Sequence, residues 1–223
     1  MEMDLFGFYQ EHFYVRDERL LSCLVENSKV RLVPKNEVFQ RMGQVNPNLD
    51  IMLHGLVRGF FPDCTGKDIT DCFEFSPGIP LMTSFELNEV SVISMEALRE
   101  TVMVSMPLAR LMPFLDHPAV MRFYVQFLSR ALRRHWESKM ILSQYSAKDR
   151  YRWFLGKYPG VIDMVNHHYV ASFLGMTPVT LSRIRSAERQ MDGVAPEERA
   201  PGMQLSCSCL LYTSDAADDL IGV

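Results

Sequence analysis

The sequence has no long hydrophobic run: no stretch of about 18 apolar residues occurs in its 223 residues, so we expect no membrane-spanning helix. Its first residues combine acidic and aromatic side chains without the cationic lead of a secretory signal. Five cysteines are present, an odd number, and none of them forms a Cys-x-x-Cys pair. We therefore expect a cytoplasmic protein with reduced thiols, no metal site and no cofactor.

Several enzyme signatures are also absent. The chain has neither a G-x-S-x-G element nor a P-loop. A metal-dependent jelly-roll oxygenase would need two or three histidines and a carboxylate that converge inside its barrel. The strand-rich region contains only His54, next to Gly55, where we expect a tight hairpin. The adjacent His167 and His168 cannot share one helical face. Because none of these catalytic patterns is present, we expect no enzymatic activity.

Charge is distributed unevenly around a net value of −4. Residues 1–116 contain 10 Lys/Arg and 17 Asp/Glu, residues 117–189 contain 12 and 4, and residues 190–223 contain 1 and 6. A basic block inside an acidic chain indicates a polyanionic partner. The alternative is a solvated, charge-rich helical surface.

The first 116 residues predict an α+β domain. Residues 4–28 have the apolar spacing of helices. Short segments rich in Val, Ile and Phe then alternate with turn residues, which predicts an antiparallel β jelly roll. These segments are residues 30–34, 37–43, 49–55, 56–62, 68–75, 89–97 and 100–107.

Residues 117–145 predict one long helix, preceded by a short helix that begins at Pro107. The long helix extends from about Ala119 to Gln144, and Leu132, Trp136 and Met140 widen its apolar surface. We expect it to dimerise with a second copy in a coiled-coil-like seam, unless it is an ordinary core helix packed on the roll. The residues expected at the dimer interface are Tyr124, Phe127, Leu128 and Ala131.

Residues 146–190 predict a helix-turn-helix domain. Ser146 is placed to cap a helix that directs Lys148, Arg150 and Arg152 outward. Two short helices follow within residues 167–189, separated by Gly175, a residue that accepts the positive φ of a helix end.

The second of these short helices has the features of a recognition helix. Thr177 can cap it and Pro178 fits its first position, while Leu181 and Ile184 continue the buried stripe. We expect it to lie in the DNA major groove, although a helical hairpin without DNA binding has similar local signals. The residues expected to contact DNA are Thr177, Val179, Thr180, Arg183 and Arg185.

The last residues, 191–223, differ from the rest. They begin with a polar segment rich in Pro and Gly, and end in LSCSCLLYTSDAADDLIGV, which has no clear period. That ending is similar to a peptide that recurs in conceptual translations of sequencing-adapter DNA. We treat residues 191–223 as a disordered or extraneous tail.

This order of elements resembles the Crp/Fnr family of bacterial transcription regulators. The similarity is strongest over residues 146–185, which read SAKDRYRWFLGKYPGVIDMVNHHYVASFLGMTPVTLSRIR. The resemblance implies a sensor roll like the cyclic-nucleotide-binding fold, a dimerising long helix and a base-contacting arginine at Arg183, with Val179 and Thr180 beside it. It also implies a homodimer on an inverted-repeat, double-stranded DNA operator, with RNA polymerase as a further candidate partner.

One segment departs from the family pattern. Nucleotide-binding members carry a Gly-Glu-Leu segment followed by an Arg that meets the cyclic phosphate. Here Gly78 is followed by Ile79, and Leu87, Asn88 and Glu89 stand where the Arg would be. Because a glutamate repels phosphate, we expect no cyclic-nucleotide binding, and the effector stays open. The alternative function is a jelly-roll protein that binds a ligand or partner without binding DNA.

Overall fold

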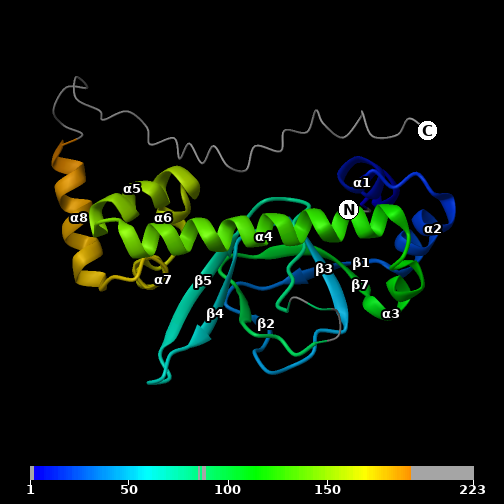
Figure 1. The fold of residues 1–223 in the computed structure, drawn as a ribbon, viewed down its shortest axis with the longest axis horizontal. Helices are drawn as coiled ribbons and strands as arrows, with labels where there is room; N and C mark the ends of the chain where they lie inside the picture. Colours follow the sequence, from blue (N-terminus) through cyan, green and yellow to red (C-terminus); the bar gives the residue numbers. More distant parts are fainter. Residues whose placement is uncertain (1–2, 85, 87–88, 192–223) are drawn as a thin grey trace. The chain divides into compact units, whose positions relative to one another are not determined.

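The computed structural model describes residues 3–84, 86 and 89–191 (Figure 1). The chain as far as Arg185 forms one compact unit, and the remainder begins at Ser186. None of the helices in the described part combines the length and apolar character that crossing a membrane requires.

The chain begins with two short helices, as its apolar spacing predicts. Helix α1 spans Leu5–Phe13 and helix α2 spans Glu18–Asn27. Asp4 caps α1 by accepting a hydrogen bond from the Gly7 amide over 2.9 Å. Asp17 caps α2 in the same way, through the Leu20 amide at 2.7 Å. Each cap satisfies a backbone donor that has no partner within its own helix.

The described strands form two antiparallel sheets. One has the order β1 (Lys29–Val33), β7 (Thr101–Pro107) and β3 (Asn48–His54). The other has the order β2 (Val38–Gln40), β6 (Ser94–Ala97), β4 (Val57–Pro62) and β5 (Asp68–Glu74). The predicted α+β fold with an antiparallel β roll is confirmed.

The predicted hairpin at Gly55 is wrong. Strand β3 pairs with β7, whereas β4 pairs with β5 and β6, so the chain passes from one sheet to the other at this glycine. Gly55 has a φ of +127°, and a Cβ there would lie 2.4 Å from the Thr101 hydroxyl oxygen. His54 is paired with Val102 of β7. A glycine between two strand-like segments indicates a sharp turn, but the partners of those strands lie far away in sequence.

Two hydrophobic clusters organise the roll. Buried side chains from both sheets meet in the first, which includes Met52, Val57 and Met103, so the sheets pack face to face. In the second cluster, α1 and α2 pack against the outer side of the three-stranded sheet, with Tyr9 and Leu20 buried against Ile51.

The second half of the described chain is helical. It comprises α3 (Leu108–Leu111), a 3-10 turn (Met112–Phe114), α4 (Pro118–Gln144), α5 (Ala147–Lys157), α6 (Val161–Met164), α7 (His167–Phe173) and α8 (Pro178–Met191). Helix α4 is 27 residues long and runs from the roll to α5 (Figure 1). The sequence does not predict the short helix α6.

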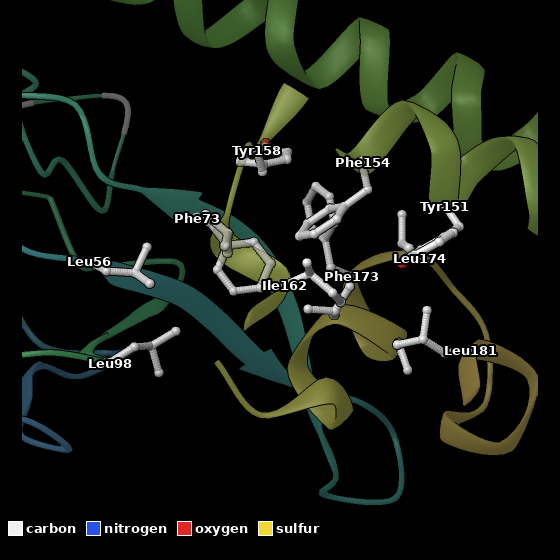
Figure 2. Close-up of a cluster of buried hydrophobic side chains, with 13 residues drawn as sticks. Leu56, Phe73, Leu98, Tyr151, Phe154, Tyr158, Ile162, Phe173, Leu174 and Leu181 are labelled. Carbon is white, nitrogen blue, oxygen red and sulfur yellow. The ribbon is translucent and has the colours of Figure 1, made fainter. Parts of the chain in front are cut away.

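A third cluster joins the segments on either side of α4, which all belong to one compact unit. Leu56, Phe73 and Leu98 of the roll are buried with side chains of α5, α6, α7 and α8, including Phe154, Phe173 and Leu181 (Figure 2). Separate sensor, dimerisation and DNA-binding domains therefore stay a prediction, which unfolding experiments can test. The expected tail lies outside the described residues except for Met191.

Candidate nucleic-acid interface

The turn between α7 and α8 has the geometry that its sequence predicts. Gly175 has a φ of +60°, the left-handed conformation that ends α7. The Thr177 hydroxyl accepts a hydrogen bond from the Thr180 amide over 3.1 Å and so caps α8. Pro178 is the first residue of that helix, where its missing amide proton costs nothing.

Arg150 of α5 holds this turn through hydrogen bonds to its carbonyls. Its Nη1 donates to the Leu174 carbonyl at 2.8 Å and to the Gly175 carbonyl at 3.4 Å. The expectation that Arg150 points outward is therefore wrong, because its guanidinium satisfies carbonyls at the end of α7. The capping prediction for the same helix is confirmed: the Ser146 hydroxyl accepts from the Asp149 amide at 3.3 Å.

The inner face of the two helices is buried as predicted. Leu181 has no exposed surface, and Ile184 packs half-buried against the same cluster. Val170 and Leu174 of the α7 segment are also fully buried. The position of α8 on α7 is thus set by contacts among apolar side chains.

The outer face of α8 presents most of the predicted DNA-contacting residues. The side chains of Thr177, Val179 and Arg183 are exposed, Val179 with 60% of its surface, and Thr180 is half-buried. Arg185 differs, because its side chain is only 12% exposed and Nη2 lies 3.5 Å from the Asp163 carboxylate. It also contacts the His167 ring. Contact of any of these residues with DNA stays a prediction.

A partly buried ion pair joins the long helix to the roll near this site. Arg134 of α4 pairs with Glu74 of β5, whose side chain is 9% exposed. Burial raises the pKa of the Glu74 carboxyl, and the positive charge of Arg134 opposes that shift. Burial likewise raises the pKa of the Tyr158 phenol, which lies at the end of α5. Sequence reasoning missed the pair, because its two members are far apart along the chain.

Two further contacts attach α5 to α4. The Trp153 indole N–H donates to the Glu137 carboxylate at 3.0 Å, and the Lys157 ammonium donates to the same group at 2.7 Å. Glu137 thus attaches α5 to α4, and Arg134 attaches α4 to β5 of the roll.

The predicted dimer residues Tyr124, Phe127, Leu128 and Ala131 are all half-buried within this single chain. Phe123 packs on Phe13 with ring centroids 4.7 Å apart, and Phe127 lies one turn further on the same face. A different set of apolar side chains on α4 is largely exposed: Met121, Val125, Leu132, Trp136 and Met140. Leu128 falls between the two sets, so the open apolar surface centres on Leu128 and Leu132.

The segment expected to replace a nucleotide-binding loop is described in part. Gly78 has a φ of +77°, and its amide donates to the Met52 carbonyl at 2.8 Å, which attaches the segment to β3. Glu89 is exposed, whereas Leu87 and Asn88 lie outside the described residues. Within residues 3–84, 86 and 89–191, no three His, Cys, Asp or Glu side chains are grouped as metal ligands.

A groove of about 810 Å³ lies between the β4–β5 hairpin, α4 and the turn that precedes α8. Its lining is mixed in charge and includes Asp71, Arg134, Lys139 and His168. The roll contributes acidic side chains such as Asp63 and Asp71 to the lining, whereas the α7–α8 segment contributes small or uncharged residues such as Gly175 and Thr177.

No family model matches this chain, and no curated protein matches it. Solved structures do. FixK2 from Bradyrhizobium japonicum is 16% identical over 77% of this chain and 89% of its own, with a TM-score of 0.67. The c-di-GMP responsive global regulator CLP of Xanthomonas campestris is 15% identical over 82% and 96%, with a TM-score of 0.63. A CRP-family transcriptional regulator from Thermus thermophilus is 20% identical over 75% and 88%, with a TM-score of 0.59.

At these identities the similarity shows the fold. The chain has the fold of Crp/Fnr-type transcription regulators along most of its length, as the order of its elements predicts.

Proposed function

We propose that this protein is a sequence-specific, DNA-binding transcription regulator of Crp/Fnr type, acting as a homodimer in the cytoplasm. The observation that carries the proposal is the exposed outer face of α8. Val179 and Arg183 point away from a helix whose inner side chain, Leu181, is completely buried. A helix fixed in this way can present base-contacting side chains to the major groove.

The chemistry of that edge suits DNA bases. An arginine at Arg183 can donate two hydrogen bonds to O6 and N7 of guanine, and the methyl groups of Val179 can pack on a thymine methyl. The Thr177 and Thr180 hydroxyls can bond base edges or phosphates. Arg185 has another role in this proposal: paired with Asp163, it braces α8 against α6.

Dimerisation supplies the second recognition helix. We propose that the exposed apolar side chains of α4, centred on Leu128 and Leu132, pack against those of a second copy. The exposed set and half-buried Leu128 give Met121, Val125, Leu128, Leu132, Trp136 and Met140, separated by four, three, four, four and four residues. They therefore lie along one side of the helix, as a dimer seam requires. A two-fold dimer places its recognition helices about one DNA turn apart and requires an inverted-repeat operator.

We also propose that the roll does not bind cyclic nucleotides. Glu89 and the Ile79 that follows Gly78 support this part of the proposal, since neither side chain can neutralise a cyclic phosphate. Calorimetry with millimolar cyclic AMP and cyclic GMP should show only the heat of dilution. Micromolar affinity for either nucleotide would sink this part of the proposal.

A gel-shift titration with the DNA upstream of the protein's own gene tests the main proposal. At a fixed salt concentration, a complex should form and persist in the presence of excess random-sequence competitor. If random-sequence DNA displaced the labelled DNA in proportion to its amount, the binding would be non-specific. Absence of any complex would favour a jelly-roll protein that binds a ligand or partner without binding DNA.

A further inference from the structure

Arg58 is a charged side chain that is buried where α7 covers the four-stranded sheet. It lies on β4, and only 4% of its side-chain surface is exposed. Nε donates to the Glu96 carboxylate on β6 at 2.6 Å, and Nη2 donates to Asp68 on β5 at 3.3 Å. Nη1 lies 3.4 Å from the Thr70 hydroxyl. Ion pairs therefore fix the guanidinium in the four-stranded sheet, as a buried charge requires.

Two aromatic rings lie close to this guanidinium. Its central carbon lies 4.2 Å from the centroid of the Phe60 ring and 3.8 Å from the centroid of the Tyr169 ring. Both distances are well inside the range of a cation–π interaction. The two rings come from different places, because Phe60 belongs to β4 itself whereas Tyr169 belongs to α7. Arg58 thus connects the sheet of the roll to the first helix of the helix-turn-helix.

Neighbouring contacts place the same face of α7 on the same sheet. The Thr70 amide donates to the Ser172 hydroxyl at 3.0 Å. That hydroxyl in turn donates to the Asp68 carbonyl at 3.4 Å. Asp68 also pairs with Arg58, so these contacts form a continuous patch along β5. Movement of α7 away from the roll would have to break all of them.

The position of α8 depends on α7. Leu181 of α8 is buried in one cluster with Val170 and Leu174, which lie on α7 and directly after it. A contact that fixes α7 to the sheet therefore also fixes the direction in which α8 presents Arg183. In a dimer, the two recognition helices must fit half-sites at a fixed spacing. If each helix can pivot in the free protein, that rotational freedom is lost on binding and the affinity for the operator falls.

We propose that Arg58 is a positioning residue for DNA reading, which acts through the Tyr169 ring to fix the orientation of the recognition helix. The proposal rests on the proposed function. Arg58 touches no DNA in this account. Its effect on operator affinity is transmitted through α7.

Tyr169→Leu is the sharpest test, because it removes the ring on α7 and leaves the pairs of Arg58 with Glu96 and Asp68 intact. Phe60→Leu is the matched control, because it removes the other ring that contacts Arg58 and keeps the contact between Arg58 and Tyr169 of α7. Tyr169→Phe is a second control that keeps the ring. All three are compared with wild type by fluorescence anisotropy, on an inverted-repeat operator and on random DNA at one salt concentration.

Tyr169→Leu should weaken operator binding by about tenfold, the effect of losing one well-formed cation–π contact, and leave random-DNA affinity unchanged. Phe60→Leu and Tyr169→Phe should stay within about twofold of wild type, since both keep the connection to α7. Equal losses for Tyr169→Leu and Phe60→Leu would overturn the proposal. Unchanged or increased operator affinity of Tyr169→Leu would overturn it as well.

Amide hydrogen exchange supplies a readout that needs no DNA. The amides of α7 should exchange faster in Tyr169→Leu than in Phe60→Leu, and unchanged exchange would contradict the connection itself. If Tyr169→Leu does not fold, Arg58→Lys takes its place, because lysine keeps the charge beside Glu96 but lacks the planar group that stacks on Tyr169. A wild-type protein without sequence preference would overturn both proposals, whereas a selective wild type with an unaffected Tyr169→Leu overturns only this one.

Discussion

The Phe73 ring on β5 meets the Phe173 ring on α7 edge to face, with their centroids 5.4 Å apart. Both side chains are buried in the cluster that also contains Phe154 of α5 (Figure 2). One residue belongs to the roll and the other to the helix-turn-helix. Because these apolar contacts are shared, we expect the two regions to fold as one cooperative unit.

Phe73→Ala should destabilise both regions together. Loss of a buried phenylalanine ring costs about 3–5 kcal/mol, and the cavity would border side chains of both regions. Urea unfolding followed by tryptophan fluorescence and by far-ultraviolet circular dichroism should give one transition, shifted to lower urea in the variant. Phe6→Ala, at a position that is 52% exposed, is the control and should shift stability by less than about 0.5 kcal/mol. Two separate transitions would instead establish independent domains.

Arg183→Ala should reduce operator binding by about tenfold to a hundredfold, because a bidentate arginine–guanine contact contributes about 1–3 kcal/mol of discrimination. Binding to random DNA should change little, since that affinity depends mainly on phosphate contacts. Arg183→Lys is the matched control, which keeps the charge and loses the planar fork. It should lose operator preference almost as fully as the alanine variant. An equal loss on operator and random DNA would show that Arg183 does not contact bases.

Arg185→Ala should behave differently from Arg183→Ala, although the two arginines are neighbours on α8. Arg185 pairs with Asp163, whose own side chain is 72% exposed, so the pair is worth no more than about 1 kcal/mol. Most of the effect should come from the lost packing of a side chain that is only 12% exposed. Thermal unfolding should therefore shift down for Arg185→Ala and not for Arg183→Ala. The reverse order would reassign Arg185 to the DNA-facing set.

Leu132→Asp should convert the protein into monomers and abolish tight operator binding. Leu132 is 60% exposed at the centre of the open apolar surface of α4, where a dimer would bury the new charge. Gln126→Asp is the control, since Gln126 is exposed on α4 outside that set of apolar side chains. Sedimentation velocity measures both. An unchanged dimer in the Leu132 variant would move the interface to another surface, with Tyr124 and Ala131 the next residues to test.

Cys72 should resist alkylation under conditions in which Cys64 reacts. Burial raises the pKa of the Cys72 thiol to about 12, with further contributions from the negative charges of Glu74 and Asp71. The thiol therefore stays protonated at pH 8, whereas Cys64 is exposed. Peptide mass spectrometry after iodoacetamide treatment reads out each site. Rapid modification of Cys72 in the native protein would contradict its burial.

The same thiol predicts the sign of a pH effect. The unfolded thiol ionises near pH 9 and the folded one near pH 12, so the folded state binds more protons between these values. Stability from Cys72 is thus fully present below about pH 9 and is lost as the pH rises toward about 12. Cys72→Ala should flatten the fall in unfolding free energy above pH 9. A fall of the same steepness in the variant would assign it to other groups.

Local signals predicted the parts of the fold that local chemistry decides. Gly175, Thr177 and Pro178 mark the turn and the cap of α8 because each acts on the backbone within a few residues of itself. Ser146 marks the start of α5 for the same reason.

Other features depend on partners that are remote in sequence. Gly55 resembles a hairpin turn until the pairing of β3 with β7 is known. Arg150 is expected to point outward, yet it donates to carbonyls of the α7 turn. Nothing local in the sequence marks Arg58 as buried, because its partner Glu96 lies on another strand. Helix α6 covers only four residues, too few for a helical periodicity to show.

Selection of bound DNA from a random pool, followed by sequencing, tests the central claim most directly. The wild-type protein should enrich an inverted repeat whose half-sites lie about one helical turn apart, with guanine at a position that Arg183→Ala no longer selects. Enrichment of no sequence over the starting pool would contradict the claim that this protein is a sequence-specific DNA-binding dimer.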